Sequence, residues 1–451
     1  MRIERLEVKN FRCLEHITIN FPAKSNIAVI VGINGAGKTT ILDGLKIVLS
    51  SIVDQLIQLE IKKDVVLQDI IGSSTIIEQD EIHYTAESSQ LDAVIKENDE
   101  HTITVLCTAK ILEEDNSEST TSNITGVNYI EQYSQDSYQN FPLFVYYHDR
   151  PIDYYHNKHR KQIKQYTKPL KIYFDKQQLN IYRGCMQADL DDFYEFTQWF
   201  ERKENFEKER RISENPNYRI SSLEAVRKTF EKLLSNLTSI PFSDLRIVSN
   251  SRDRVFPFRR RIPNPTLVIS KDNQDFKLDQ LSSGEKRLLM LATDLARRLA
   301  IANPGLGENA WQGEGIVLID EIDLHLHPQW QRRVLPALTK TFPNCQFIVT
   351  THSPQVLSEV PKESVFILED GKLLEYSPHT RGRDSNSILY EIFNVKERPE
   401  WSQQEIDHCL DLIDNEKWDE AREALKELSN RLGENDTAVV QAQSILHFME
   451  D

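Results

Sequence analysis

The start of the chain shows two different hydrophobic patterns. Apolar and polar residues alternate in 3–11 and again in 17–21, which predicts two half-buried strands paired as a hairpin. Residues 27–31 are all apolar and mostly β-branched, as expected of a strand buried on both faces. A glycine-rich stretch at 32–40 follows, and 41–49 continue with helical spacing. We therefore predict a hairpin, then a strand, a glycine loop and a helix.

The middle of the chain is less regular. Residues 113–125 are rich in acids, Ser, Thr and Asn, which predicts an exposed loop, whereas the apolar and aromatic residues 141–147 predict another buried strand. Helical patterns cover 189–211 and 222–237, with an Asn-Pro-Asn turn between them at 215–217. Two antiparallel helices of this size would reach about 30 Å. We therefore expect a short helical arm.

Strands and helices alternate again in the last third of the chain. We predict a helix after Ser283, a strand at 316–319, a helix after His327 and a strand at 346–350. The section from 401 onward predicts two or three amphipathic helices. The alternation of strands and helices favours an α/β fold.

Composition is that of a folded soluble protein, with 39% hydrophobic and 27% charged residues. The five cysteines are scattered and show no CxxC spacing, which argues against a disulfide framework or a structural zinc site. The first residues lack the apolar core of a signal peptide, and no stretch approaches the ~18 apolar residues of a membrane span. We expect a cytoplasmic protein with no membrane partner.

The charge is unevenly distributed. The net charge of −16 argues against a general nucleic-acid binder, because the phosphate backbone attracts clustered Lys and Arg. From residue 396 onward, 15 acids face 6 bases. In contrast, 150–176 hold 8 bases and 2 acids, and 259–261 are three arginines. Each basic cluster is either a solvated face or a docking surface for nucleic acid or an acidic partner.

A phosphate-binding pattern follows the first apolar strand. Residues 32–39 fit G-x-x-x-x-G-K-[ST], in which backbone N–H groups and the start of a helix surround a phosphate. In this pattern Lys38 bridges the β- and γ-phosphates, and Thr39 places its hydroxyl on Mg²⁺. The candidate ATP-binding residues of the loop are Gly32, Asn34, Gly35, Ala36, Gly37, Lys38, Thr39 and Thr40.

Two adjacent carboxylates end the strand predicted at 316–319. Neighbouring side chains of a strand point to opposite faces, but where the chain turns at the strand's end both can face one cleft. We expect Asp320 to hold the Mg²⁺ shell. Glu321 is the candidate catalytic base, which orients and deprotonates the attacking water.

The pentapeptide Leu-Ser-Ser-Gly-Glu at 281–285 resembles the signature motif of the ABC superfamily, with Ser283 in place of the first glycine. The resemblance implies that Ser282, Ser283, Gly284 and Glu285 face the γ-phosphate held by a second protomer. From the residues alone, Ser282 with Glu285 three positions on is also a capping box at a helix start. The two roles can hold together.

Other positions match the same superfamily. His352 follows the strand at 346–350, where the family has a switch histidine that contacts the γ-phosphate, so we count it as catalytic. Asp323 falls in the D-loop that crosses the family's dimer interface, and Arg12 falls where the opening strand approaches the nucleotide. His325 and His327 have an H-x-H spacing, but no third metal ligand lies nearby in sequence. We expect them to be interface or structural residues.

The chain as a whole resembles a compact ATPase of the ABC/SMC type, over about 1–50 and 278–358. It lacks the long coiled coils of SMC proteins and the Toprim nuclease domain of OLD-type enzymes. It is most similar to PtuA, the ATPase family of Septu-type and retron-associated anti-phage systems, on segments such as GEGIVLIDEIDLHLHPQWQ. The resemblance implies a homodimer or higher even oligomer around ATP and Mg²⁺. It also implies a separately encoded partner nuclease of the HNH type, which the ATPase restrains or licenses.

This resemblance implies four parts in an α/β, ABC-type head with a helical arm and tail. They are a first ATPase lobe at 1–150 with a loop insertion at about 55–140, a basic segment and arm at 151–245, a second lobe at 246–395, and an acidic helical tail at 396–451.

One alternative is a RecF- or SMC-like repair ATPase that acts directly on DNA. The acidic balance favours a protein partner, while the basic segment at 150–176 favours DNA. A second alternative is a scaffold locked by nucleotide with negligible turnover.

Overall fold

The computed structural model describes two compact units, Met1–Arg383 and Asp384–Asp451. The basic clusters at 150–176 and 259–261 lie outside the described residues. The described residues are 1–58, 76–96, 101–111, 118–126, 140–148, 177–189, 193–238, 240–249 and 265–450.

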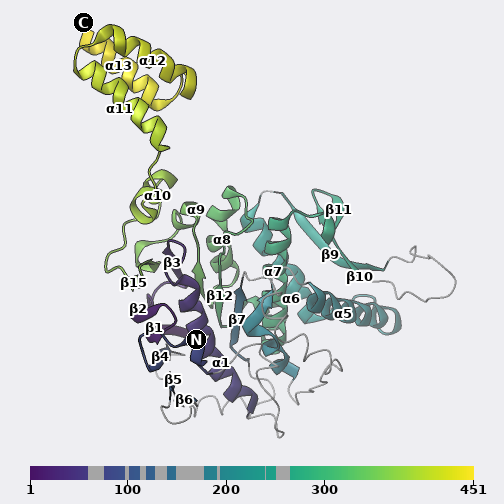
Figure 1. Cartoon of the computed structure of the whole chain (residues 1–451). Helices are drawn as coiled ribbons and strands as arrows, with labels where there is room; N and C mark the ends of the chain where they lie inside the picture. Colours follow the sequence, from purple (N-terminus) through teal and green to yellow (C-terminus); the bar gives the residue numbers. More distant parts are fainter. Residues whose placement is uncertain are drawn as a thin grey trace, which may run out of the picture. The chain divides into compact units, whose positions relative to one another are not determined.

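A seven-stranded, mostly parallel sheet forms the centre of the first unit (Figure 1). Its order is β15-β14-β3-β13-β12-β7-β8, and only β15 is antiparallel to its neighbour. All residues of β12 and β13 are buried, as expected of a sheet covered on both faces. The strands are β3 (Ile27–Gly32), β7 (Leu143–His148), β8 (Ala188–Asp189), β12 (Gly315–Ile319), β13 (Cys345–Thr350), β14 (Val365–Glu369) and β15 (Lys372–Leu373). The four predicted apolar strands and the α/β class are confirmed.

A five-stranded antiparallel sheet, ordered β2-β1-β4-β5-β6, forms a second layer. Helix α1 (Lys38–Gln58) shares one hydrophobic core with the inner face of this sheet and with the central sheet. The predicted opening hairpin is confirmed as β1 and β2. The strands are β1 (Arg2–Phe11), β2 (Leu14–Asn20), β4 (Ser88–Lys96), β5 (Thr102–Ile111) and β6 (Glu118–Thr125).

The exposed loop expected at 113–125 is wrong for Glu118–Thr125, which is strand β6. This strand pairs along its length with β5, and the hydroxyls of Thr108 and Thr121 lie 2.8 Å apart across the pair. The strand could not be recognised from the sequence because its residues are mostly polar, although Thr is favoured in strands. The loop insertion expected at about 55–140 likewise holds β4, β5 and β6.

Helices and a small sheet complete the first unit. Helix α6 packs its apolar face against α7 and α8, and its Phe230 and Leu233 are fully buried. In α5, Phe200 is buried but Phe206 and Ile212 are exposed, so only the distal half of α5 has the exposure expected of an arm. The helices are α5 (Tyr194–Ser213), α6 (Ser221–Leu237), α7 (Ser283–Ala302), α8 (Pro328–Thr341) and α9 (Pro354–Leu357); the sheet is β11 (Gln274–Lys277), β10 (Pro265–Lys271) and β9 (Phe242–Ser249).

Short 3-10 helices connect these elements. They are η1 (Gln79–Glu81), η3 (Gln177–Tyr182), η4 (Cys185–Gln187), η5 (Leu278–Gln280), η6 (Pro304–Gln312) and η7 (Lys362–Ser364).

The second unit is a small helical body with its own core. Helices α10 (Ser385–Phe393), α11 (Glu400–Asp414), α12 (Trp418–Leu432) and α13 (Thr437–Glu450) form it. Cys409, Ile413 and Ala421 are fully buried at its centre. The unit begins at Asp384 and therefore includes α10, whereas the tail predicted from the sequence begins at 396. None of the described helices is long and apolar enough to span a membrane.

Candidate ATP site

The glycine loop between β3 and α1 needs its glycines for steric reasons. Gly35 and Gly37 have φ of +83° and +103°, a region that L side chains rarely adopt. A Cβ on Gly37 would also approach a Leu14 methyl to 2.7 Å, and one on Gly32 would approach the Leu368 carbonyl oxygen to 2.4 Å. The loop therefore packs its backbone directly against β2 and β14, and larger residues at Gly32 or Gly37 would force it away.

Lys38, the first residue of α1, holds its charge inside this loop. Its Nζ donates to the carbonyl oxygens of Gly32 and Ile33, both at 3.0 Å. The residue is 7% exposed, and burial lowers the pKa of its ammonium. The carboxylates of Asp320 and Glu321 oppose that shift. This arrangement suits the binding of a triphosphate, because phosphate oxygens can replace the two carbonyl oxygens as acceptors for the Lys38 ammonium.

Parallel pairing of β12 with β13, and of β13 with β3, brings two oxygen ligands together at the ends of these strands. The Thr39 hydroxyl donates to Asp320 Oδ2 at 3.0 Å, although the two residues belong to distant parts of the sequence. The Thr350 hydroxyl donates to Asp320 Oδ1 at 2.6 Å. A hydroxyl and a carboxylate at this separation are hard donors of the kind Mg²⁺ takes, with phosphate oxygens and water filling its other positions. Thr39 and Asp320 therefore fit the ion assigned to them.

The chain turns directly after Asp320, as the position of Glu321 at the strand's end requires. Glu321 has φ of +50°, which is uncommon for a residue other than glycine. Its backbone N–H donates to the Thr350 hydroxyl at 2.8 Å, and the Ile322 N–H donates to the Thr350 carbonyl at 3.1 Å. These bonds hold the left-handed conformation in place and fix the direction in which the Glu321 side chain leaves the backbone.

His352 and Asp323 share the electrostatic environment of this centre. Burial lowers the pKa of His352, and the positive charge of Lys38 lowers it further. The carboxylates of Asp323 and Asp320 oppose that shift. The structure therefore brings His352 and Asp323 into the electrostatic field of Lys38 and Asp320, and their roles as switch histidine and D-loop residue stay predictions.

The signature motif forms the start of α7. Ser282 is its N-cap and forms a reciprocal capping box with Glu285. A Cβ on Gly284 would lie 2.5 Å from the carbonyl oxygen of His325, so the glycine is required by the close approach of the loop after β12. His327 is itself the N-cap of α8, with Nδ1 accepting from the backbone of Gln329 at 3.2 Å.

The His327 side chain thus caps a helix, and the His325 backbone lies against Gly284, while an interface role for either histidine stays a prediction. Within the described parts of the chain, no group of three or more His, Cys, Asp or Glu side chains could hold a metal ion.

Arg12 lies between carboxylates. Its guanidinium forms ion pairs with Asp43 of α1 and with Glu81, the latter at 2.7 Å. Burial alone would lower the pKa of Arg12, but these two charges outweigh it and raise the pKa. Arg12 therefore anchors the second turn of α1, just behind the phosphate loop. Its approach to the nucleotide stays a prediction.

Comparison with known families decides the class of this site. The family model described as AAA ATPase domain matches residues 1–357. The chain belongs to this AAA ATPase family. The predicted ATPase activity and the binding of nucleotide are thereby confirmed.

Relatives of this AAA ATPase include retron and Septu proteins. It is 28% identical to the retron Ec83 probable ATPase of Escherichia coli over 483 residues, which covers 98% of this chain and 86% of the relative. It is 34% identical to the Septu protein PtuA of Bacillus mycoides over 129 residues, which covers 27% of this chain and 17% of the relative. Among solved structures, the Smc head bound to the C-winged helix domain of ScpA aligns with a TM-score of 0.44 and 18% identity, covering 84% of this chain and 98% of that one. The predicted resemblance to Septu and retron ATPases is confirmed.

Two residues of the AAA ATPase site carry no motif. Thr350 bonds both Asp320 and the backbone of Glu321, and the only hint in the sequence is a polar residue ending the strand before His352. Lys271 forms an ion pair with the signature residue Glu285 at 2.5 Å, and nothing in the local sequence marks it.

Proposed function

We propose that this AAA ATPase binds ATP and Mg²⁺ between two copies of itself, and that its nucleotide state regulates a separately encoded nuclease in anti-phage defence. The ATP site is supported chiefly by one observation. Lys38 and Thr39, which follow the phosphate loop, lie beside Asp320, which follows the distant strand β12. Support for the defence role comes from the retron and Septu relatives.

Each residue has a defined task in the proposed reaction. Lys38 and the loop N–H groups bind the β- and γ-phosphates. Mg²⁺, held by Thr39 and Asp320, supplies charge neutralisation on the phosphate oxygens when it is bound. Glu321 accepts a proton from the water molecule as the water oxygen attacks the γ-phosphorus. The bond between the γ-phosphorus and the β–γ bridging oxygen breaks, which gives ADP and phosphate. His352 contacts the γ-phosphate and senses its loss.

A composite site with a second copy follows from the separation of motifs. Among the contacts of the described residues, Ser282 bonds Glu285, and Glu285 also bonds Lys271. Lys38 bonds a carbonyl of the phosphate loop, and Thr39 bonds Asp320. The start of α7 presents the N-terminus of a helix and its capping residue Ser282 to an anion. A γ-phosphate from a second copy would use those donors, as the resemblance to the ABC superfamily implies.

The partner nuclease is proposed to dock on the second unit. From residue 396 onward the chain carries 15 acids and 6 bases, which would attract a basic partner surface. Trp401, Val440 and Phe448 are exposed there, at 50%, 47% and 82%. Aromatic side chains beside charges are typical of protein interfaces. The resemblance to PtuA implies that this partner is an HNH nuclease.

Mixing two defective variants tests the composite site. Lys38→Ala removes the loop cation, and Ser282→Arg blocks the signature with a bulky side chain. Each variant alone is expected to lose ATP hydrolysis, whereas their mixture restores one working site per mixed dimer. Ser282→Arg should still bind ATP as a protomer. Undiminished turnover by Ser282→Arg alone would show that the motif is only a helix cap.

A further inference from the structure

A carboxylate already occupies the donors of the signature motif. Glu285 Oε2 accepts from the Ser282 backbone N–H at 2.9 Å and from the Ser282 hydroxyl at 2.8 Å. The Glu285 N–H returns a bond to Ser282 Oγ at 3.3 Å. These are donors that a helix start offers to an incoming anion. A phosphate arriving from a second copy must therefore take them from Glu285.

A lysine from another element holds that carboxylate. Lys271 ends β10, and its Nζ lies 2.5 Å from Glu285 Oε1. The ammonium also lies 5.7 Å from the centre of the Phe242 ring and 5.9 Å from that of Phe276. The two paired side chains are 26% and 11% exposed. An ion pair that is half-buried and lies beside aromatic rings is stronger than one at an open surface, so Lys271 has a defined position.

We propose that Lys271 is a positioning residue for the phosphate site in trans: it holds Glu285 away from Ser282 when the γ-phosphate of a second copy arrives. This inference rests on the proposed composite site. Ser282 contacts the phosphate, whereas Lys271 acts through Glu285.

The sign of the effect follows from charge. Without Lys271, Glu285 keeps an uncompensated negative charge within hydrogen-bond reach of Ser282, where it repels a phosphate and holds the serine hydroxyl. Without the charge of Glu285, Lys271 is left free to attract the same phosphate. The two removals therefore act in opposite directions on ATP-dependent association. A pair that served only to stabilise the fold would show the same direction for both.

The two oxygens of the Glu285 carboxylate have different partners. Oε1 pairs with Lys271 at 2.5 Å, and Oε2 accepts from Ser282. The side chain also lines a small apolar cavity with Leu281 and Trp330. Release of Ser282 therefore leaves Glu285 with Lys271 as its counter-ion.

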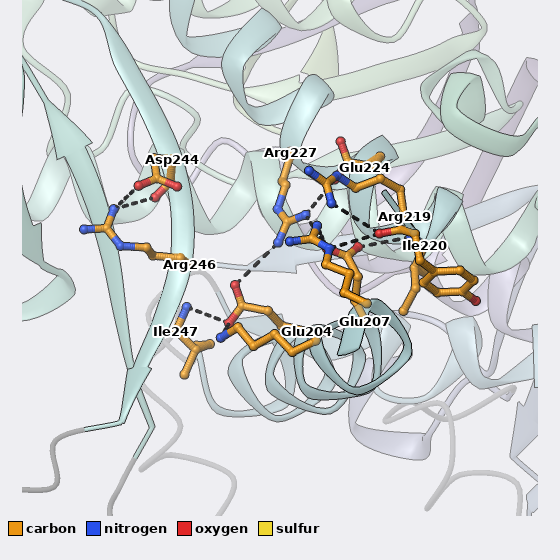
Figure 2. A network of polar contacts seen from close by, with 12 residues as sticks. Glu204, Glu207, Arg219, Ile220, Glu224, Arg227, Asp244, Arg246 and Ile247 are labelled. Carbon is orange, nitrogen blue, oxygen red and sulfur yellow. Dashed lines mark hydrogen bonds and ion pairs between the residues drawn. The ribbon is translucent and has the colours of Figure 1, made fainter. Parts of the chain in front are cut away.

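The sheet that carries Lys271 is anchored to the arm (Figure 2). In β9, the Ile247 N–H donates to Glu204 of α5 at 3.2 Å, and Glu204 is only 4% exposed. Arg246 of the same strand bonds Asp275 of β11 at 2.5 Å, across the intervening β10. The three-stranded sheet that contains Lys271 is thus bonded to α5 through β9.

The test measures ATP-dependent association in a background that cannot hydrolyse. The parent is the full chain with Glu321→Gln, and sedimentation at several protein concentrations gives the dimer dissociation constant. Lys271→Met is expected to weaken association by about tenfold, the effect of one charge within ~4–6 Å. Glu285→Gln is expected to tighten it about two- to tenfold, since glutamine keeps the capping box without the charge. The double variant should return to within about threefold of the parent.

Controls separate this effect from folding and from nucleotide binding. Lys277→Met removes an exposed lysine from the same sheet and should leave association unchanged. Binding of a fluorescent ATP analogue to dilute protomers should be equal in all variants. If Lys271→Met does not fold, Glu285→Gln tests the inference without it. Weaker association of Glu285→Gln than of the parent would overturn the inference. Equal association by Lys271→Met and the parent also overturns it. A parent that does not associate with ATP contradicts the proposed function and this inference together.

Discussion

At the scale of single residues, one hydroxyl orders the centre of the ATP site. Thr350 Oγ1 donates to Asp320 Oδ1 and accepts from the backbone N–H of Glu321. It is fully buried, so neither bond can be replaced by bulk water. The hydroxyl thus fixes both Asp320, the proposed magnesium ligand, and the backbone of Glu321, the proposed catalytic base.

Replacing this hydroxyl should slow hydrolysis without abolishing nucleotide binding. Thr350→Val keeps the shape of the side chain but leaves Asp320 and the Glu321 N–H each short of a partner. We expect kcat to fall by about 10- to 100-fold, the usual effect of losing a group that orients a ligand. ATP affinity should change little, because the phosphate loop is untouched. Thr350→Ser, which keeps the hydroxyl, is the control, and a wild-type kcat in Thr350→Val would contradict the assigned role.

Glu321→Gln should separate binding from chemistry. The amide cannot accept the proton of the attacking water, so hydrolysis should fall by about 10²–10⁴, the contribution of a positioned base. ATP binding should persist, and with it a dimer closed on ATP. Steady-state phosphate release and light scattering with ATP measure the two effects. Hydrolysis at the wild-type rate would show that another group is the base.

The residues of the site differ in how far they could be predicted from sequence. In the proposed site, Lys38, Thr39 and Asp320 touch the nucleotide or its ion directly. Lys38 and Thr39 therefore belong to a motif of fixed spacing, and Asp320 is marked by the apolar strand that it follows. Thr350 and Lys271 act through another residue. Their position depends on strand pairing between distant segments, and such pairing leaves no local pattern.

At the scale of elements, buried carboxylates join α5 to its neighbours (Figure 2). Glu207 is 1% exposed and accepts from Arg227 of α6 at 3.4 Å and from the Ile220 N–H, just before α6, at 3.1 Å. It also pairs with Arg211 one turn along α5. These bonds close the turn between α5 and α6 and satisfy a backbone donor at the helix start.

Removing one of these carboxylates should destabilise the first unit. Glu207→Ala leaves the Ile220 N–H without its acceptor, whereas Arg211 keeps the Tyr218 carbonyl and Arg227 keeps Glu224. A buried donor without a partner costs about 1–3 kcal/mol, so we expect a loss of that size. Glu209→Ala, an exposed glutamate on the same helix, should change stability by less than about 0.5 kcal/mol. Urea unfolding of the two variants measures the difference. Equal midpoints would mean that the network around Glu207 contributes nothing to the fold.

Elements could be predicted well where they are apolar throughout and poorly where they are polar. The buried strands β3 and β12 are continuous apolar runs that have few other interpretations, and β13 has an apolar centre between Gln346 and Thr350. In contrast, β6 (Glu118–Thr125) is an edge strand of polar residues, and only its pairing with β5 makes it a strand. Helix α6 was predicted correctly as a helix, but its burial depends on α7 and α8, which lie far away in sequence.

At the scale of the whole molecule, the two units have separate hydrophobic cores, so the second unit can be deleted to test its role. Deleting Asp384–Asp451 removes only the helical unit, whose buried side chains pack among themselves. We expect Met1–Arg383 to stay folded and to bind ATP with unchanged affinity, measured by calorimetry. Loss of partner binding or self-association in this variant would support a docking role for the second unit. An insoluble product would instead support a packing role against the ATPase.

The intact chain should not cleave nucleic acid by itself. We expect incubation of the pure protein with ATP, Mg²⁺ and DNA or RNA to leave the substrate intact, with cleavage appearing only when the partner nuclease is added. Robust cleavage by the chain alone would overturn its regulatory role. Stimulation of its ATPase by DNA without any partner would favour the repair-type alternative.

The order of strands has a consequence for synthesis on the ribosome. Strand β3, which leads into the phosphate loop, emerges early, but its two neighbours in the sheet are β13, which begins at Cys345, and β14, which begins at Val365. At about 5–20 residues per second, the nascent chain waits tens of seconds before either neighbour exists. A truncated product that ends before Cys345 therefore has a phosphate loop without its sheet and lacks Thr350. Translation that stops before Cys345 would therefore yield no fragment with an assembled ATP site, and a response to ATP requires synthesis to continue through β13 and β14.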